Sequence, residues 1–162
     1  MLVDIVSKNG NLLLNIPVRG DGSIDEKELA VVEGITAWMD VNSECIYGTR
    51  PWEIYGEGPK AESVNPINAQ GFNEGKGAPY TSADIRFTKK GDVLYAIIMD
   101  QPENNEMLIK SLAVNGLYYS EKYKNVAVLV SEPAAYSFSE KGLQVKFRDD
   151  FKPDMPVVLK IY

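Results

Sequence analysis

Histidine is absent from this chain of 162 residues, and cysteine occurs once, at Cys45. Without histidine, the chain lacks the commonest general base and the commonest side-chain ligand of transition metals. A single cysteine can form neither an internal disulfide nor a cysteine-rich zinc site. It also has no histidine to activate it as a nucleophile, so we interpret Cys45 as a small apolar packing residue. We therefore expect no metal site and no cofactor.

Basic clusters and long apolar runs are also missing. The 17 Lys and Arg residues against 23 Asp and Glu residues give a net charge of -6, and no basic patch stands out. Nucleic acids and anionic membranes are therefore excluded as expected partners. No segment approaches the ~20 apolar residues that cross a bilayer. Residues 1–10 also lack the basic and apolar regions of a signal peptide, although this leaves the compartment open.

The hydrophobic fraction of 44% is enough for a packed core. Residues 1–8 have the apolar spacing of a helix end, stopped by Asn9 and Gly10. Residues 12–16 form a short apolar run between turn signals, which is typical of a strand buried in a parallel α/β sheet. Ser23 and Glu26 have the spacing of a capping box, and the apolar stripe that follows predicts a helix ending near Asn42. One such strand cannot form a sheet alone, so this opening resembles the end of a larger α/β domain.

The pattern changes after the aromatic connector around Arg50 and Pro51, where we place a domain boundary between residues 1–50 and 51–162. Short runs with strand character follow at close spacing, separated by turn residues, and no convincing helix lies among them. They comprise residues 84–88, 93–99, 108–114, 124–130, 135–138, 143–147 and 156–162. The expected fold is mostly β: a C-terminal antiparallel β-sandwich, preceded by a strand and a helix from an incomplete α/β domain.

Carboxylates are numerous, so a catalytic pair must be considered. Glycoside hydrolysis needs two carboxyl groups about 5–10 Å apart on either side of the scissile bond. The acidic residues occur at a helix start (Asp21, Asp25, Glu26, Glu28), in a polar loop (Asp100, Glu103, Glu106) and before the last strand (Asp149, Asp150). None lies in an apolar stretch that would raise its pKa, so we expect no catalytic residue among them.

Two further features could contact a sugar. Asn15 lies at the carboxyl end of the predicted strand, the end at which α/β barrels carry their active sites, although its amide could equally anchor the next loop. Aromatic residues gather in two segments, which could stack on sugars or pack against neighbouring strands, and packing is the favoured interpretation. They are Trp52, Tyr55 and Phe72 in the connector and Tyr118, Tyr119 and Tyr123 in a later loop.

Residues 4–16 (DIVSKNGNLLLNI) resemble the end of the catalytic barrel in α-L-fucosidases of glycoside hydrolase family 29. The resemblance continues in order along the chain, which makes it specific, and the later motifs resemble the bacterial members. The further motifs are DGSI at 21–24, AWMDVN at 37–42, IYGTRPW at 46–52, YGEGP at 55–59, DIRFT at 84–88, GD at 91–92 and LYAI at 94–97.

The resemblance implies a (β/α)8-like barrel followed by a β-sandwich, in an enzyme that removes terminal α-L-fucose from glycans with retention. It also implies that the aspartate nucleophile, the acid/base and the fucose-binding histidines and tryptophan precede Asp4. On that basis the chain is a C-terminal fragment that is inactive alone. Asn15 is then the one residue expected near the sugar site, and fucosylated glycans bind through the missing barrel.

A second interpretation stays open at this point: a non-catalytic β-sandwich that binds carbohydrate or a protein partner. A free-standing module has no need of the barrel-like strand and helix in residues 1–50. If those elements are present without the rest of a barrel, they should cover the sandwich, pair with a second copy of the chain or leave an apolar surface exposed. Self-association through this barrel remnant is therefore a further expectation.

Overall fold

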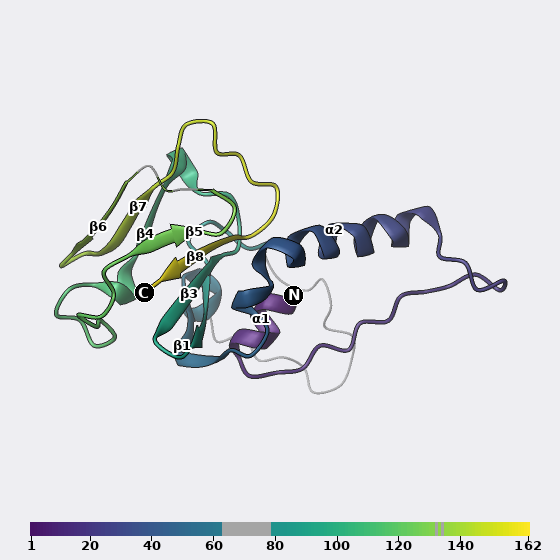
Figure 1. Cartoon of the computed structure of the whole chain (residues 1–162), viewed down its shortest axis with the longest axis horizontal. Helices are drawn as coiled ribbons and strands as arrows, with labels where there is room; N and C mark the ends of the chain where they lie inside the picture. Colours follow the sequence, from purple (N-terminus) through teal and green to yellow (C-terminus); the bar gives the residue numbers. More distant parts are fainter. Residues whose placement is uncertain (63–78, 132, 134) are drawn as a thin grey trace.

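Two antiparallel sheets form the body of the protein in a computed structural model that describes residues 1–62, 79–131, 133 and 135–162 (Figure 1). Five strands form the larger sheet in the order β1 (Arg50–Glu57), β2 (Ile85–Lys90), β3 (Val93–Ile98), β8 (Val157–Ile161) and β5 (Val126–Val128). Three strands form the smaller sheet in the order β4 (Glu106–Ile109), β7 (Gly142–Lys146) and β6 (Ala135–Ser139). The predicted mostly-β fold with antiparallel sheets is confirmed.

The helices are few. They comprise α1 (Leu2–Ser7), α2 (Glu26–Asn42) and α3 (Pro59–Glu62), with 3-10 turns at Ser43–Cys45, Glu103–Asn105 and Lys110–Leu112. Over the part of the chain that the structure describes, none of the helices is long and apolar enough to span a membrane.

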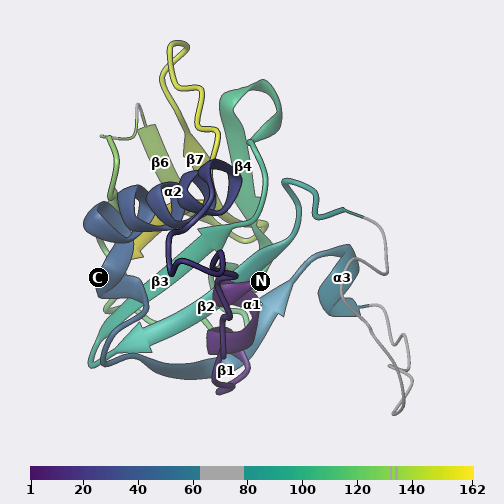
Figure 2. The same cartoon turned by 90° about the vertical axis from the view of Figure 1, so that its right-hand side faces the viewer.

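The five-stranded sheet is buried on both faces. Along β3, Leu94, Ala96 and Ile98 point into a core shared with the three-stranded sheet, whereas Tyr95 and Ile97 point into a second core beneath the helices. Since successive side chains of a strand alternate between faces, a strand apolar at every position must be covered on both sides. The molecule thus has three layers: the small sheet, the large sheet and a partial layer of helices (Figure 2).

An ion pair fixes α1 to the large sheet. The Arg86 side chain on β2 is only 1% exposed, and its Nε donates to Asp4 Oδ1 on α1 at 2.6 Å. Lys8 Nζ lies 2.9 Å from the other oxygen of the same carboxylate. Burial raises the pKa of Asp4, but the hydrogen bonds from Lys8 and Arg86 outweigh it, so the pKa lies below its ordinary value of 3.8. The pair is therefore charged at neutral pH.

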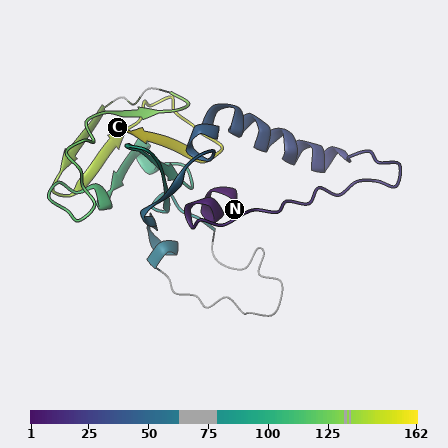
Figure 3. The same cartoon turned by 60° about the horizontal axis from the view of Figure 1, so that its bottom comes forward.

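The carboxyl-terminal end of α2 is attached to the body. Trp38, 8% exposed, donates its indole N–H to the carbonyl oxygen of Pro156 at 2.7 Å, next to β8. Towards its amino-terminal end, α2 projects away from the sheets, and the chain that precedes it follows it outwards (Figures 1 and 3). We call α2 and residues 9–25 the arm.

The predicted strand at residues 12–16 is wrong. Residues 10–19 are extended but form no strand, and Leu13 and Leu14 are exposed. A strand is defined by hydrogen bonds to a neighbour, and among the described residues no strand lies beside this segment. The apolar run thus has the composition of a buried strand without the neighbours that would bury it.

Three smaller expectations also need correction. The N-cap of α2 is Asp25, whose carboxylate accepts from the backbone N–H groups of Lys27 and Glu28, while Ser23 bonds Asp21 instead of forming a capping box. The strand expected at 108–114 is β4, which ends at Ile109 and continues as a 3-10 turn. The glycine-rich connector after Arg50 contains β1, which the sequence pattern did not indicate. The predicted end of the arm helix near Asn42 is confirmed.

We expect Asp4→Ala to destabilise the protein by about 3 kcal/mol, because it leaves the guanidinium of Arg86 buried without its counter-charge. Lys8→Ala is the matched control: it removes the partly exposed partner of the same carboxylate and should cost less than about 1 kcal/mol. Urea unfolding followed by circular dichroism measures both. Equal losses in the two variants would show that the Arg86–Asp4 pair does not anchor α1.

Cys45 should resist alkylation in the folded protein. Its side chain is fully buried, and burial, with the nearby charge of Glu44, raises the pKa of the thiol to about 12. The thiolate is the reactive form, so the folded protein at pH 8 should gain no mass from iodoacetamide, while the same protein in urea should gain one adduct. Rapid labelling of the native protein would contradict the packing role assigned to Cys45.

Candidate functional site

The first candidate surface is an apolar groove along the arm. It lies between α1, the extended segment before α2, and one face of α2, with a volume of ≈ 410 Å³. Leu12, Leu14, Val31, Ile35, Trp38 and Met39 are among the side chains that line it. Four residues of the apolar stripe on α2, Val31, Ile35, Trp38 and Met39, therefore line an open groove.

Exposed apolar side chains concentrate in this part of the molecule. Of the fifteen large hydrophobic residues exposed in the described part of the chain, nine fall within residues 1–47. Leu13 is 85% exposed, and Val31 is 53% exposed. Single exposed apolar residues are ordinary on protein surfaces, but a contiguous group of them indicates a contact surface. Four of the nine, Met1, Leu14, Val31 and Tyr47, line the groove, so exposed apolar side chains form part of its walls.

Asn15, the predicted sugar-contacting residue, is exposed on the extended segment of the arm. Its neighbour Leu14 lines the apolar groove. The proposed contact of Asn15 with a sugar stays a prediction.

Several carboxylates hold backbone or cationic groups in place. Asp25 caps α2, and the buried Asp84 accepts from the backbone N–H groups of Lys60 and Thr81. Glu57 accepts from the backbone N–H groups of Lys110 and Ser111. Glu44 pairs with Lys160 at 2.8 Å. These contacts give the carboxylates structural roles.

Sequence reasoning did not identify the roles of Asp84, Glu57 and Glu44. For Asp84 a signal existed, since Thr81 three residues earlier has the spacing of a capped turn. Glu57 and Glu44 offered no such signal, because their partners are distant in sequence. Among the residues that the structure describes, no group of three or more His, Cys, Asp or Glu side chains could hold a metal ion.

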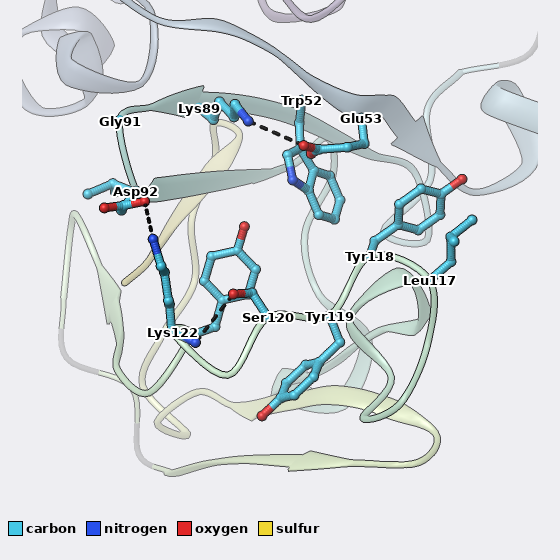
Figure 4. Close-up of a pocket in the computed structure, with 12 residues that line it drawn as sticks. Trp52, Glu53, Lys89, Gly91, Asp92, Leu117, Tyr118, Tyr119, Ser120 and Lys122 are labelled. Atoms are coloured by element: carbon cyan, nitrogen blue, oxygen red, sulfur yellow. Dashed lines mark hydrogen bonds and ion pairs between the residues drawn. The ribbon is translucent and has the colours of Figure 1, made fainter.

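The second candidate surface is a cleft of ≈ 310 Å³ at the other face of the large sheet, which we call the aromatic cleft (Figure 4). Trp52 of β1 forms its base, with its ring 4.8 Å from Phe87 and 5.6 Å from Tyr118 between centroids. Tyr123 lies beside Trp52. Burial and the charge of Glu53 raise the pKa of Tyr123, while a hydrogen bond from Trp52 acts in the opposite direction.

Two exposed ion pairs border the aromatic cleft. Lys89 Nζ lies 3.2 Å from Glu53 Oε1, and Lys122 Nζ lies 2.9 Å from Asp92 Oδ1. Both pairs are drawn as dashed lines in Figure 4. Each lysine is thus matched by a carboxylate, so the rim of the cleft carries polar atoms without an excess of charge.

Only part of the predicted aromatic set meets here. Trp52, Tyr118 and Tyr123 come together, while Tyr119 also lines the cleft but packs its ring on Phe138, 5.9 Å away. Tyr55 lies elsewhere, with Lys8 Nζ 4.9 Å from its ring centroid. Phe72 lies outside the described residues. Packing thus accounts for the positions of Tyr55 and of the Tyr119 ring. It does not account for the aromatic surface that the cleft leaves open to solvent.

Comparison with known proteins agrees with the fold. The family model described as α-L-fucosidase matches residues 1–44. Human tissue α-L-fucosidase is 31% identical over 114 residues, which cover 68% of this chain and 19% of the human protein. An α-L-fucosidase of Branchiostoma floridae is 30% identical over 109 residues, or 67% of this chain and 19% of that protein.

Solved structures match nearly the whole chain. The α-fucosidase of Thermotoga maritima in complex with fucose superposes with a TM-score of 0.68 and 25% identity, over 99% of this chain and 32% of that one. The isoenzyme 1 α-L-fucosidase of Paenibacillus thiaminolyticus has the same fold, with a TM-score of 0.66 at 23% identity.

Taken with the antiparallel sandwich and the apolar arm, these matches place the chain among the α-L-fucosidases of glycoside hydrolase family 29, as the counterpart of their C-terminal portion. The resemblance found in the sequence is confirmed. The chain spans about a fifth of the length of the curated relatives and about a third of the solved structures.

The apolar groove should bind the dye ANS, which fluoresces on exposed apolar surface. We expect Val31→Glu to reduce this fluorescence by about half, because Val31 forms part of one wall and bound dye would have to desolvate the introduced carboxylate. Ala37→Glu is the matched control, since Ala37 lies on the same helix but outside the groove lining. Equal dye binding by both variants would show that the groove is not an accessible apolar surface.

Proposed function

We propose that the chain forms the C-terminal portion of a retaining α-L-fucosidase, which hydrolyses terminal α-L-fucose from glycans. Within that enzyme, residues 1–50 complete the catalytic barrel and residues 51–162 form the sandwich that supports it. The observation that most supports this proposal is the apolar groove on the arm. Its lining has the composition of a domain interior, yet the groove is open, and it lies along residues that match the family model.

The geometry of the arm supports this division of roles. The body of the sandwich encloses its own core between two sheets, and from the arm only Trp38 and Met39 pack against the core on the helix side. The extended residues 10–19 have backbone groups ready to pair with an adjacent strand, and α2 presents an apolar stripe beside them. A neighbouring barrel strand and helix would bury both at once, as in the βα units of parallel barrels.

The catalytic carboxylates are assigned to the part of the enzyme that precedes this chain. Asp4, Glu44, Glu57 and Asp84 are committed to partners within the fold. The Thermotoga maritima relative was solved with fucose, which supports an α-L-fucoside as the substrate class. Asn15, on the arm, remains the residue of this chain proposed to lie nearest the sugar.

The role of the arm has a consequence for the chain on its own. Without the rest of the barrel, the apolar lining of the groove is exposed to solvent. A second copy of the chain carries the same apolar groove, so the two grooves could cover each other. We therefore also propose that the isolated chain self-associates through the groove.

The chain alone should not hydrolyse an aryl α-L-fucoside. A chromogenic assay at neutral pH detects turnover, and NMR of any product gives the anomer first released. We expect no release above a blank preparation, because the proposal places both catalytic carboxylates outside residues 1–162. Turnover that co-purifies with the chain through a second column would contradict this and would require each acidic residue to be replaced in turn.

A further inference from the structure

We propose that the aromatic cleft binds a neutral saccharide at a site separate from the catalytic centre. The proposal goes beyond the fucosidase role and does not depend on it, because the cleft and the apolar groove lie on different sides of the large sheet. Trp52 belongs to the core shared by the two sheets, whereas Trp38, which lines the groove, belongs to the core beneath the helices. A barrel seated on the arm would therefore leave the cleft accessible.

The base of the cleft is rigid. Trp52 is 7% exposed and is held by Phe87 on one side and Tyr118 on another. Tyr123 also packs against the core that contains Trp52, and both residues line the cleft. A preformed site saves a ligand the cost of ordering the side chains that receive it. Tyr118 and Tyr123 are half-buried, and both line the cleft.

One wall of the cleft carries an unusual apolar residue. Leu117 is 86% exposed, more than any other large hydrophobic side chain in the described residues, and it stands beside Tyr118 at the mouth of the cleft. Folding gains nothing from a leucine in that position. A ligand that covers both Leu117 and the open part of Tyr118 would bury the apolar surface that the fold leaves exposed.

The mixture of groups matches the surface of a sugar ring. A pyranose presents C–H groups on its faces, which pack on aromatic rings, and hydroxyl groups at its edge, which seek hydrogen bonds. The rings of Tyr118 and Tyr123 offer the first kind of contact. The carboxylates of Glu53 and Asp92 and the hydroxyl of Ser120, all in the lining, offer the second.

Charge and size narrow the class of ligand. Lys89 and Lys122 are each paired with a carboxylate, so the cleft offers no excess positive charge to a phosphate or a uronic acid. Its volume of ≈ 310 Å³ lies at the lower end of small-molecule sites, which are about 300–1,000 Å³. The ligand is therefore a short, uncharged saccharide or the end of a longer one.

The two tryptophans make the test direct. Trp52 lies in the cleft and Trp38 in the groove, and the chain has no others. Each gives one indole N–H signal in a proton–nitrogen NMR spectrum of the full chain. We expect lactose or L-fucose at millimolar concentration to shift the Trp52 signal saturably and leave Trp38 unchanged, and sodium glucuronate to bind more weakly.

Variants separate a binding site from a packing site. Tyr118→Ala should weaken binding about tenfold, because it removes one aromatic contact surface. Leu117→Ala should weaken it about threefold without affecting folding, since the side chain is almost fully exposed. Tyr47→Ala is the control: Tyr47 is an exposed tyrosine that lines the groove instead, and its loss should leave saccharide affinity unchanged.

Each outcome decides the proposal. A saturable Trp52 shift that weakens in Leu117→Ala but not in Tyr47→Ala supports it, even if Tyr118→Ala does not fold. No Trp52 shift at tens of millimolar of either sugar overturns it. A shift of Trp38 alone would also overturn it and would place sugar at the groove, a result that leaves the proposed fucosidase role intact.

Discussion

The buried charge of Arg86 is the constraint on which the rest of the structure depends. A guanidinium that is 1% exposed must have a counter-charge, because an unpaired buried ion costs several kcal/mol. Asp4 supplies it from α1, 82 residues earlier in the chain. This ion pair and the packing of Val3 attach the amino-terminal helix to the helix-facing side of the large sheet, and the arm begins beyond that helix.

With α1 attached there, both faces of the large sheet are covered, which is why both can be apolar. The small sheet covers one face, and α1, the end of α2 and the 3-10 turn at Ser43–Cys45 cover the other. The cover on the helix side is partial, because only the carboxyl-terminal end of α2, around Trp38, lies on the sheet, while its amino-terminal part projects outwards (Figure 3). The exposed apolar groove follows from this geometry: its residues lie on an element that reaches beyond the body of the molecule.

The two candidate surfaces therefore differ in kind. The groove is apolar, lies on the arm and has the composition of a domain interior, which suits a covalently connected neighbour within one enzyme. The aromatic cleft combines rings with paired charges on the face of the sheet away from the arm, which suits a soluble polar ligand. The two proposed roles, support of a barrel and binding of a saccharide, therefore fall on separate surfaces of the chain.

The sequence by itself determined the elements whose signals are local: the helix end stopped by Asn9, the hairpin of β2 and β3, the strands β6 to β8 and the family resemblance. It could not determine whether residues 12–16 become a strand, because strand formation depends on a neighbour and not on apolar composition. It also missed β1, whose glycines and proline resemble a loop until β2 pairs with it. The pairing of Asp4 with Arg86 and the meeting of Trp52, Tyr118 and Tyr123 were decided by tertiary structure alone, since each joins residues far apart in the chain.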